Sequence, residues 1–94
     1  MTLEIKPWDP AEYLDSREAV AAYIEAAFED GDPAAIAHAL GVVARAKGMS
    51  QLAREAGVTR EGLYKALSSD GDPKLSTFLS VLKALGMKIS AHAA

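Results

Sequence analysis

The sequence predicts an all-α domain of five helices, with ends that are compatible with short β-strands. Apolar residues recur at helical spacing in several segments of the 94-residue chain. Asp-Pro pairs precede some of these segments and glycines follow them, as at helix starts and stops. The length favours one domain, residues 1–94. The chain has no cysteine, which excludes disulfide scaffolds and thiolate metal sites.

The first 32 residues predict an acidic extension made of a strand and a helix. Residues 2–6 alternate polar and apolar side chains and are bounded by Pro7, as in a short strand. Asp9-Pro10 reads as a helix start, with Asp as the cap and Pro in the first turn. Asp15-Ser16 is a further helix start. The helix that follows has the strongest helical periodicity of apolar residues in the chain. Its apolar face comprises Ala19, Val20, Tyr23, Ile24, Ala27 and Phe28.

Residues 33–86 are expected to form the core of the domain. Gly31 ends the preceding helix, and Asp32-Pro33 opens a helix that reaches about Lys47 and stops at Gly48. Arg45 and Lys47 lie in its last turn, where cations suit the helix dipole. The expected buried stripe of this helix comprises Ile36, Ala37, Leu40, Val43 and Ala44.

Met49–Leu67 has the pattern of two short helices joined by a tight turn, as in a helix-turn-helix. Gly57 supplies a positive φ at the bend without a Cβ clash. Thr59 can cap the second helix by accepting a bond from a backbone N–H of its first turn. Leu63 and Leu67 then continue the apolar pattern at a spacing of four. We interpret this second helix as a recognition helix.

A last helix and a tail complete the chain. Residues 68–74 are rich in turn formers, and we expect Ser76 or Thr77 to open a helix closed by Gly86. The inward residues of this helix would be Phe78, Leu79, Leu82 and Leu85. Residues 87–90 alternate again, so residues 87–94 are expected to be a strand or a tail. The two terminal strands would pair within one chain or across a dimer; frayed ends are the alternative.

The net charge of −3 is unevenly distributed. Residues 1–32 hold nine acidic and two basic residues, whereas residues 45–94 hold eight basic and four acidic ones. This asymmetry indicates two surfaces for two kinds of partner, with solvated helix faces as the alternative.

Several classes of protein find no support. No apolar run is long enough to span a membrane, and the N-terminus lacks the pattern of a signal peptide. The absence of cysteine fits a reducing cytoplasm. No catalytic constellation, metal-ligand spacing or cofactor motif is present, so we expect a protein that is not an enzyme and has no cofactor. His38 is expected to be a surface or interface residue and not a general base.

The expected DNA-binding residues lie mostly on the outward side of the recognition helix. They are Thr59, Arg60, Glu61, Tyr64 and Lys65, with Gln51 and Arg54 from the preceding helix. Arg60 can bind a guanine with two hydrogen bonds, and Glu61 can accept one from a cytosine amino group. Arg54, Lys74, Arg45 and Lys47 lie near enough to contact phosphates. The alternative is a solvated helix face with a Glu61–Lys65 pair.

The segment Met49–Leu67 resembles the helix-turn-helix of the Cro/C1-repressor type. The matching residues are Leu52-Ala53, the run from Gly57 to Arg60, and Leu63. In that superfamily a small pair four residues apart lets the two helices pack closely, and Ala53 and Gly57 match it. The family usually places a Ser/Thr-Gln pair where this chain has Gly48-Met49. Here Ser50-Gln51 follows two residues later.

A wider pattern in residues 9–15, 21–33, 39–53 and 62–67 resembles the addiction-module antidote family, small antitoxins of type II toxin–antitoxin pairs similar to the Hig group. The resemblance implies an antitoxin that binds operator DNA, represses its own operon and neutralises a RelE/ParE-superfamily toxin by direct binding. One domain reads few base pairs, so a homodimer on a palindrome is expected. The alternatives are a stand-alone dimeric repressor and a protein-interaction module.

Overall fold

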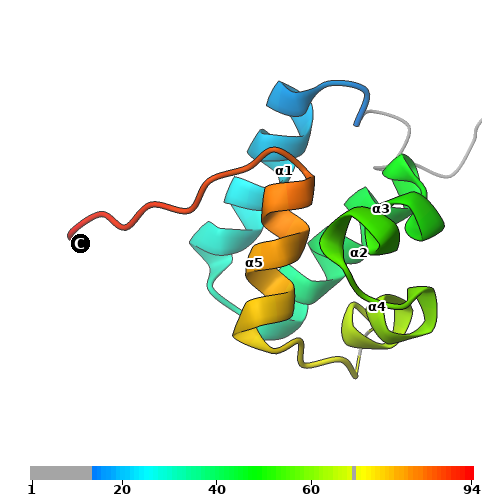
Figure 1. Cartoon of the computed structure of the whole chain (residues 1–94). Helices are drawn as coiled ribbons and strands as arrows, with labels where there is room; N and C mark the ends of the chain where they lie inside the picture. Colours follow the sequence, from blue (N-terminus) through cyan, green and yellow to red (C-terminus); the bar gives the residue numbers. More distant parts are fainter. Residues whose placement is uncertain (1–13, 69) are drawn as a thin grey trace, which may run out of the picture.

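The computed structural model describes residues 14–68 and 70–94, which contain five α-helices and no strand (Figure 1). The helices are α1 (Arg17–Asp30), α2 (Pro33–Lys47), α3 (Met49–Ala56), α4 (Arg60–Ala66) and α5 (Leu75–Ala84). Helix α1 packs on α2, while α3 packs against α2, α4 and α5. The predicted all-α class is therefore confirmed for the described residues. The expected strand at residues 2–6 and the helix start at Asp9-Pro10 lie outside them.

The signals that begin and end the first two helices are found where the sequence predicted them. The Ser16 hydroxyl accepts a hydrogen bond from the Ala19 N–H at 3.1 Å, which caps α1. Gly31 ends this helix with a φ of 74°, a conformation that favours glycine. Pro33 occupies the first position of α2, where its missing N–H costs nothing, and the Asp32 side chain makes no capping bond.

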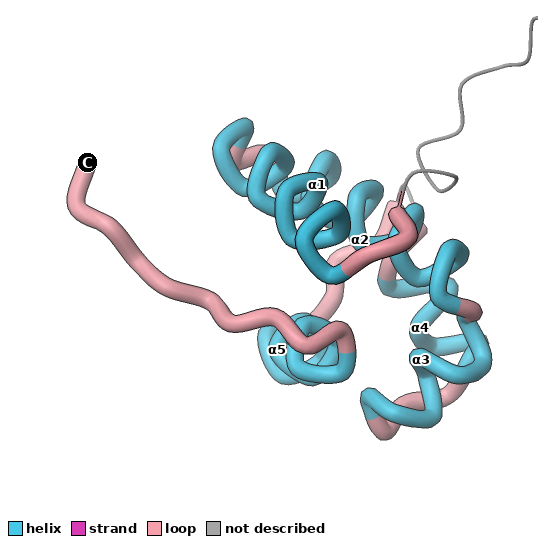
Figure 2. The backbone as a smooth tube through the Cα atoms, turned by 90° about the horizontal axis from the view of Figure 1, so that it is seen from above, coloured by secondary structure: helices cyan, strands magenta, loops and turns pink. Residues whose placement is uncertain are grey.

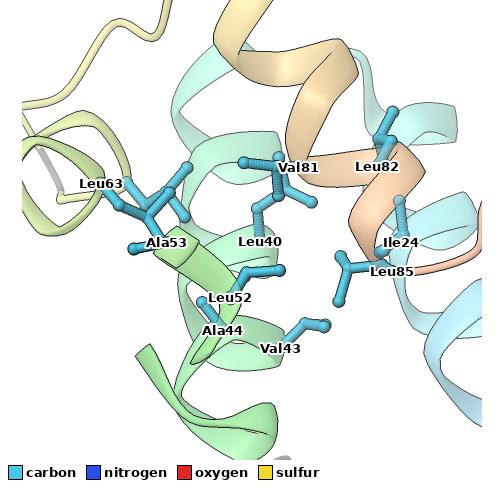
Figure 3. Packing of buried hydrophobic residues seen from close by; sticks show 11 residues of the cluster. Ile24, Leu40, Val43, Ala44, Leu52, Ala53, Leu63, Val81, Leu82 and Leu85 are labelled. Atoms are coloured by element: carbon cyan, nitrogen blue, oxygen red, sulfur yellow. The ribbon is translucent and has the colours of Figure 1, made fainter. Parts of the chain in front are cut away.

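The core is one apolar cluster to which all five helices contribute (Figure 3). Its centre is formed by Leu40 of α2, Leu52 of α3 and Leu63 of α4, all three fully buried. The other buried members are Ile24, Val43, Ala44, Ala53, Leu67, Val81, Leu82 and Leu85. The predicted apolar faces of α1 and α2 are confirmed, because each of their residues is buried or half-buried.

Helix α5 differs from the prediction in its start and in its inward face. It begins at Leu75, after Lys74, and not at Ser76 or Thr77. Leu79 is 46% exposed, whereas Val81 is fully buried. The buried face runs through Phe78, Val81 and Leu82, three and four residues apart. Leu79 follows Phe78 by about 100° around the helix and so turns away from the core.

Residues 87–94 form a tail and not a strand, the two alternatives that the sequence left open. The Met87 N–H still bonds to the Leu82 carbonyl at 2.9 Å, as part of the end of α5. Beyond it the tail is irregular and extends past the helices (Figure 2), and Ile89 is 48% exposed. An alternating pattern forms a strand only where a partner strand accepts its hydrogen bonds, and the described part of the chain offers none.

Helix α2 approaches the end of α4 closely at Gly41. A methyl group placed on Gly41 would lie only 3.0 Å from the carbonyl oxygen of Leu67. The missing side chain therefore permits a close approach of α2 to the backbone of Leu67, the residue that caps the end of α4.

The two leucines of α5 give a direct test of this packing. We expect Leu82→Ala to lower the free energy of unfolding by about 2–5 kcal/mol, because it removes a side chain that is 2% exposed. Leu79→Ala, the matched control on the same helix, should cost less than about 1 kcal/mol. Urea unfolding measures both, and equal losses would contradict the observed orientation of α5.

Candidate nucleic-acid interface

Helices α3 and α4 are joined by a turn of three residues that begins at Gly57. This glycine has a φ of 75°, as the sequence predicted. The Val58 N–H bonds to the Ala53 carbonyl at 3.0 Å, and the Gly57 N–H bonds to the Arg54 carbonyl at 3.3 Å. The bond from Val58 closes α3 in the manner of a Schellman motif. The turn is therefore held by backbone bonds and sets the direction in which α4 leaves it.

Thr59 caps α4, as predicted. Its backbone is extended, and its hydroxyl accepts a hydrogen bond from the Gly62 N–H at 3.0 Å. A methyl group placed on Gly62 would lie 2.8 Å from that hydroxyl oxygen. The tight cap gives a structural reason for a glycine inside an exposed helix, where it costs about 1 kcal/mol relative to alanine.

Helix α4 presents one apolar and one polar side. Leu63 and Leu67 are buried, which confirms the predicted apolar pattern, and Ala66 beside them is half-buried. The predicted outward residues are all exposed: Thr59, Arg60, Glu61, Tyr64 and Lys65. Tyr64 is 65% exposed, a high fraction for a large aromatic side chain. The surface pair expected between Glu61 and Lys65 is absent from the ion pairs of the described residues.

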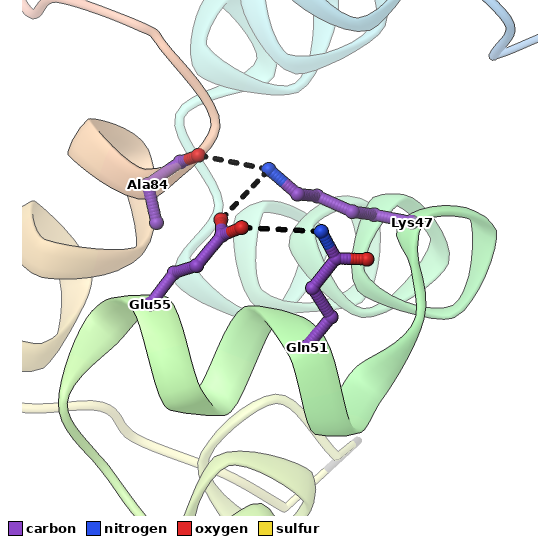
Figure 4. Close-up of polar contacts among 4 residues, drawn as sticks. All are labelled: Lys47, Gln51, Glu55 and Ala84. Carbon is purple, nitrogen blue, oxygen red and sulfur yellow. Dashed lines mark hydrogen bonds and ion pairs between the residues drawn. The ribbon is translucent and has the colours of Figure 1, made fainter.

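Gln51 belongs to a different group of side chains (Figure 4). Its amide donates to Glu55 at 3.2 Å, and Glu55 pairs with the Lys47 ammonium at 3.0 Å. That ammonium also donates to the carbonyl of Ala84 at 2.9 Å. Gln51 is thereby directed toward the ends of α2 and α5. The ammonium of Lys47, considered above for phosphate contact, is occupied by these two partners.

The Lys47 ammonium holds the pKa of the Glu55 carboxyl below its ordinary value of 4.5, and the hydrogen bond from Gln51 acts in the same direction. The Gln51–Glu55 spacing of four is visible in the sequence. The partners from α2 and α5 were not predicted, because they come together only when three helix ends meet.

The remaining residue of the predicted site, Arg54, is exposed in the last turn of α3. The start of that helix has no side-chain cap, because Gly48 stands there with a φ of 111°. The described residues contain no group of three His, Asp or Glu side chains that could hold a metal ion. None of the described helices is long and apolar enough to cross a bilayer.

The cap at Thr59 can be tested by substitution. We expect Thr59→Ala to lower the free energy of unfolding by about 0.5–2 kcal/mol, because a backbone N–H loses its acceptor. Thr59→Ser keeps a hydroxyl in place and should retain most of that stability. Chemical denaturation of the three proteins measures the effect, and equal losses for alanine and serine would rule out the cap.

The Glu55 pair predicts a pH dependence of stability. A lowered pKa in the folded state means stability that is present above the ordinary pKa and lost as the pH falls through the lowered value. Glu55→Gln should therefore have a lower Tm than the unsubstituted protein at neutral pH. The difference should shrink as the pH falls through the lowered pKa, because the carboxyl is then protonated in both states. Lys47→Gln should reduce the same dependence. A Tm difference that stays constant with pH would contradict this role.

Comparison with known proteins places the chain in a family. A profile of the family described as "probable addiction module antidote protein" matches residues 4–93. An uncharacterized protein of Haemophilus influenzae (strain ATCC 51907 / DSM 11121 / KW20 / Rd) is 46% identical over 92 residues, which cover 98% of this chain and 95% of that protein. No solved structure matches, so the Cro/C1-type and Hig-like resemblances stay predictions. The chain belongs to the probable addiction module antidote family.

Proposed function

We propose that this chain is the antitoxin of a type II toxin–antitoxin module. It neutralises a toxin of the RelE/ParE superfamily by direct binding, and it binds its own operator through a Cro/C1-type helix-turn-helix formed by α3 and α4. Membership of an antidote family supports the toxin partner. The observation that carries the DNA-binding part is the outward side of α4, whose five polar residues are all exposed above two buried leucines.

The chemistry of that side suits base recognition. A recognition helix presents the residues near its N-terminus to base edges in the major groove. Arg60 and Glu61 follow the cap directly and offer a guanidinium for guanine and a carboxylate for cytosine. Tyr64 and Lys65 lie one turn further on, within reach of base or backbone. Arg54 adds a cation for a phosphate, which makes the affinity depend on salt.

A seven-residue helix contacts only a few base pairs, so specificity requires a second copy. We infer a homodimer that places two α4 helices in successive major grooves of a palindromic operator. Repression follows when the bound dimer occupies the promoter. We propose accordingly that the protein acts in the cytoplasm, where operator DNA lies, and that it binds its partners without catalysing a reaction.

The acidic side of the molecule is the proposed toxin-binding surface. Four exposed carboxylates lie on α1: Glu18, Glu25, Glu29 and Asp30. Toxins that act on RNA need basic surfaces, and opposite charges accelerate and orient association. Separate surfaces for DNA and toxin allow one chain to bind both.

The DNA-binding part is tested with Arg60→Ala. We expect its affinity for a duplex from the promoter upstream of its own gene to fall by about 1–3 kcal/mol and its preference at one base position to relax, because a guanine contact is lost. Fluorescence anisotropy measures both. Lys88→Ala, which removes a charge from the tail, is the control.

Operator binding and toxin binding can be contradicted separately. If the unsubstituted protein does not bind the promoter duplex at low salt, operator binding is ruled out. The toxin part is tested by co-expression with the product of the neighbouring gene. Failure to form a complex and to restore growth leaves a stand-alone repressor as the function.

A further inference from the structure

A hollow of about 340 Å³ lies between α2, the start of α3 and the end of α4. We call it the α2–α4 hollow. It is lined by His38, Gly41, Val42, Arg45, Met49, Tyr64, Leu67 and Ser68. Of these, Val42 and Leu67 are buried, whereas His38, Arg45 and Tyr64 are exposed. The hollow therefore has an apolar floor and a polar rim.

The spacing of residues on α2 builds this arrangement. His38, Gly41 and Arg45 recur at intervals of three and four, so they share one face of the helix. Gly41 is the point at which this face meets the backbone of Leu67. His38 and Arg45 stand one turn before and one turn after that contact. They consequently flank the end of α4, where Tyr64 and Ser68 complete the rim.

The lack of carboxylates separates the lining of this hollow from the linings of two others in the described structure. The hollow at the start of α1 includes Asp15 beside Arg17, Lys47 and Lys83. The one between α1 and the tail includes Glu25 and Glu29 beside Lys88 and His92. The α2–α4 hollow has no carboxylate in its lining and offers a guanidinium, an imidazole and a phenol. The Ser68 hydroxyl already donates to the Lys65 carbonyl at 2.8 Å, so it serves as an acceptor. The other three groups donate hydrogen bonds, the imidazole in either protonation state.

Tyr64 connects the hollow to the proposed DNA-binding side of α4, because it is exposed on that side and also lines the rim. A helix that enters the major groove has a phosphate strand along each edge of it. We propose that the α2–α4 hollow receives a backbone phosphate of one of these strands, bound by Arg45, His38 and the Tyr64 hydroxyl. This inference rests on the proposed operator binding, and it assigns to α2 the task of fixing the position of α4 along the DNA.

The test uses His38→Gln/Arg45→Gln in the full-length protein. Anisotropy titrations use the promoter duplex and a scrambled duplex of equal length, each over a series of salt concentrations. We expect the double variant to bind both duplexes at least about tenfold more weakly, because a charge-assisted hydrogen bond is worth about one decade in affinity. The slope of log affinity against log salt should fall by about one, and the preference for the promoter should be unchanged.

Two controls make the result specific. Lys83→Gln/Lys88→Gln removes two positive charges away from the hollow and should leave the slope nearly unchanged. Arg45→Lys keeps the charge and should retain most of the slope. The four substituted side chains, His38, Arg45, Lys83 and Lys88, are exposed, and an unchanged Tm confirms that each variant is folded.

The phosphate site would be contradicted if the unsubstituted parent protein binds the promoter and the double variant shows the same affinity and salt slope. That result would leave the proposed function standing. Failure of the parent to bind either duplex would overturn both. A loss confined to co-purification with the neighbouring gene product would assign the hollow to a protein partner and overturn the phosphate site.

Discussion

The burial of Leu63 and Leu67 is the interaction on which the polar side of α4 depends. A helix of seven residues is not stable alone in water, because so short a segment makes too few hydrogen bonds to offset the cost of nucleation. Leu63 is fully buried in the cluster with Leu40 and Leu52, and Leu67 lies against α2 at Gly41. These contacts, together with the cap at Thr59, determine which side chains of α4 remain exposed.

The same packing separates two surfaces of opposite charge. The acidic residues of α1 lie on a helix that packs on α2, whereas α4 packs on the other end of the core, through α3. The described residues bury no polar or charged side chain, so the core contributes apolar packing alone and polar chemistry is confined to the surface. Under the proposed function, this division would let the toxin and the operator bind without displacing each other.

Local signals predicted most of the fold. The glycine at 57, the cap at Thr59 and the inward leucines of α4 depend on a few neighbouring residues, and all were predicted. The start of α5 and the exposure of Leu79 were not, because the rotation of that helix depends on its packing against α3 and α1. The alternating pattern at residues 87–90 left a strand and a tail both open for a related reason, since strand pairing needs a partner that periodicity cannot supply. The bond from Lys47 to Ala84 joins residues 37 apart in the sequence, beyond the reach of any spacing rule.

For the site, the sequence identified the outward residues of α4, but not the hollow beside it that Gly41 lines.

Helix α4 is the element proposed to contact operator DNA. The most direct test of this contact is a titration of the ¹⁵N-labelled protein with the promoter duplex, followed by NMR spectra of the backbone amides. We predict the largest shifts at residues 59–65, with smaller ones at His38 and Arg45 and none on the outward side of α1. Shifts confined to α1 or to the tail, with residues 59–65 unaffected, would contradict the claim.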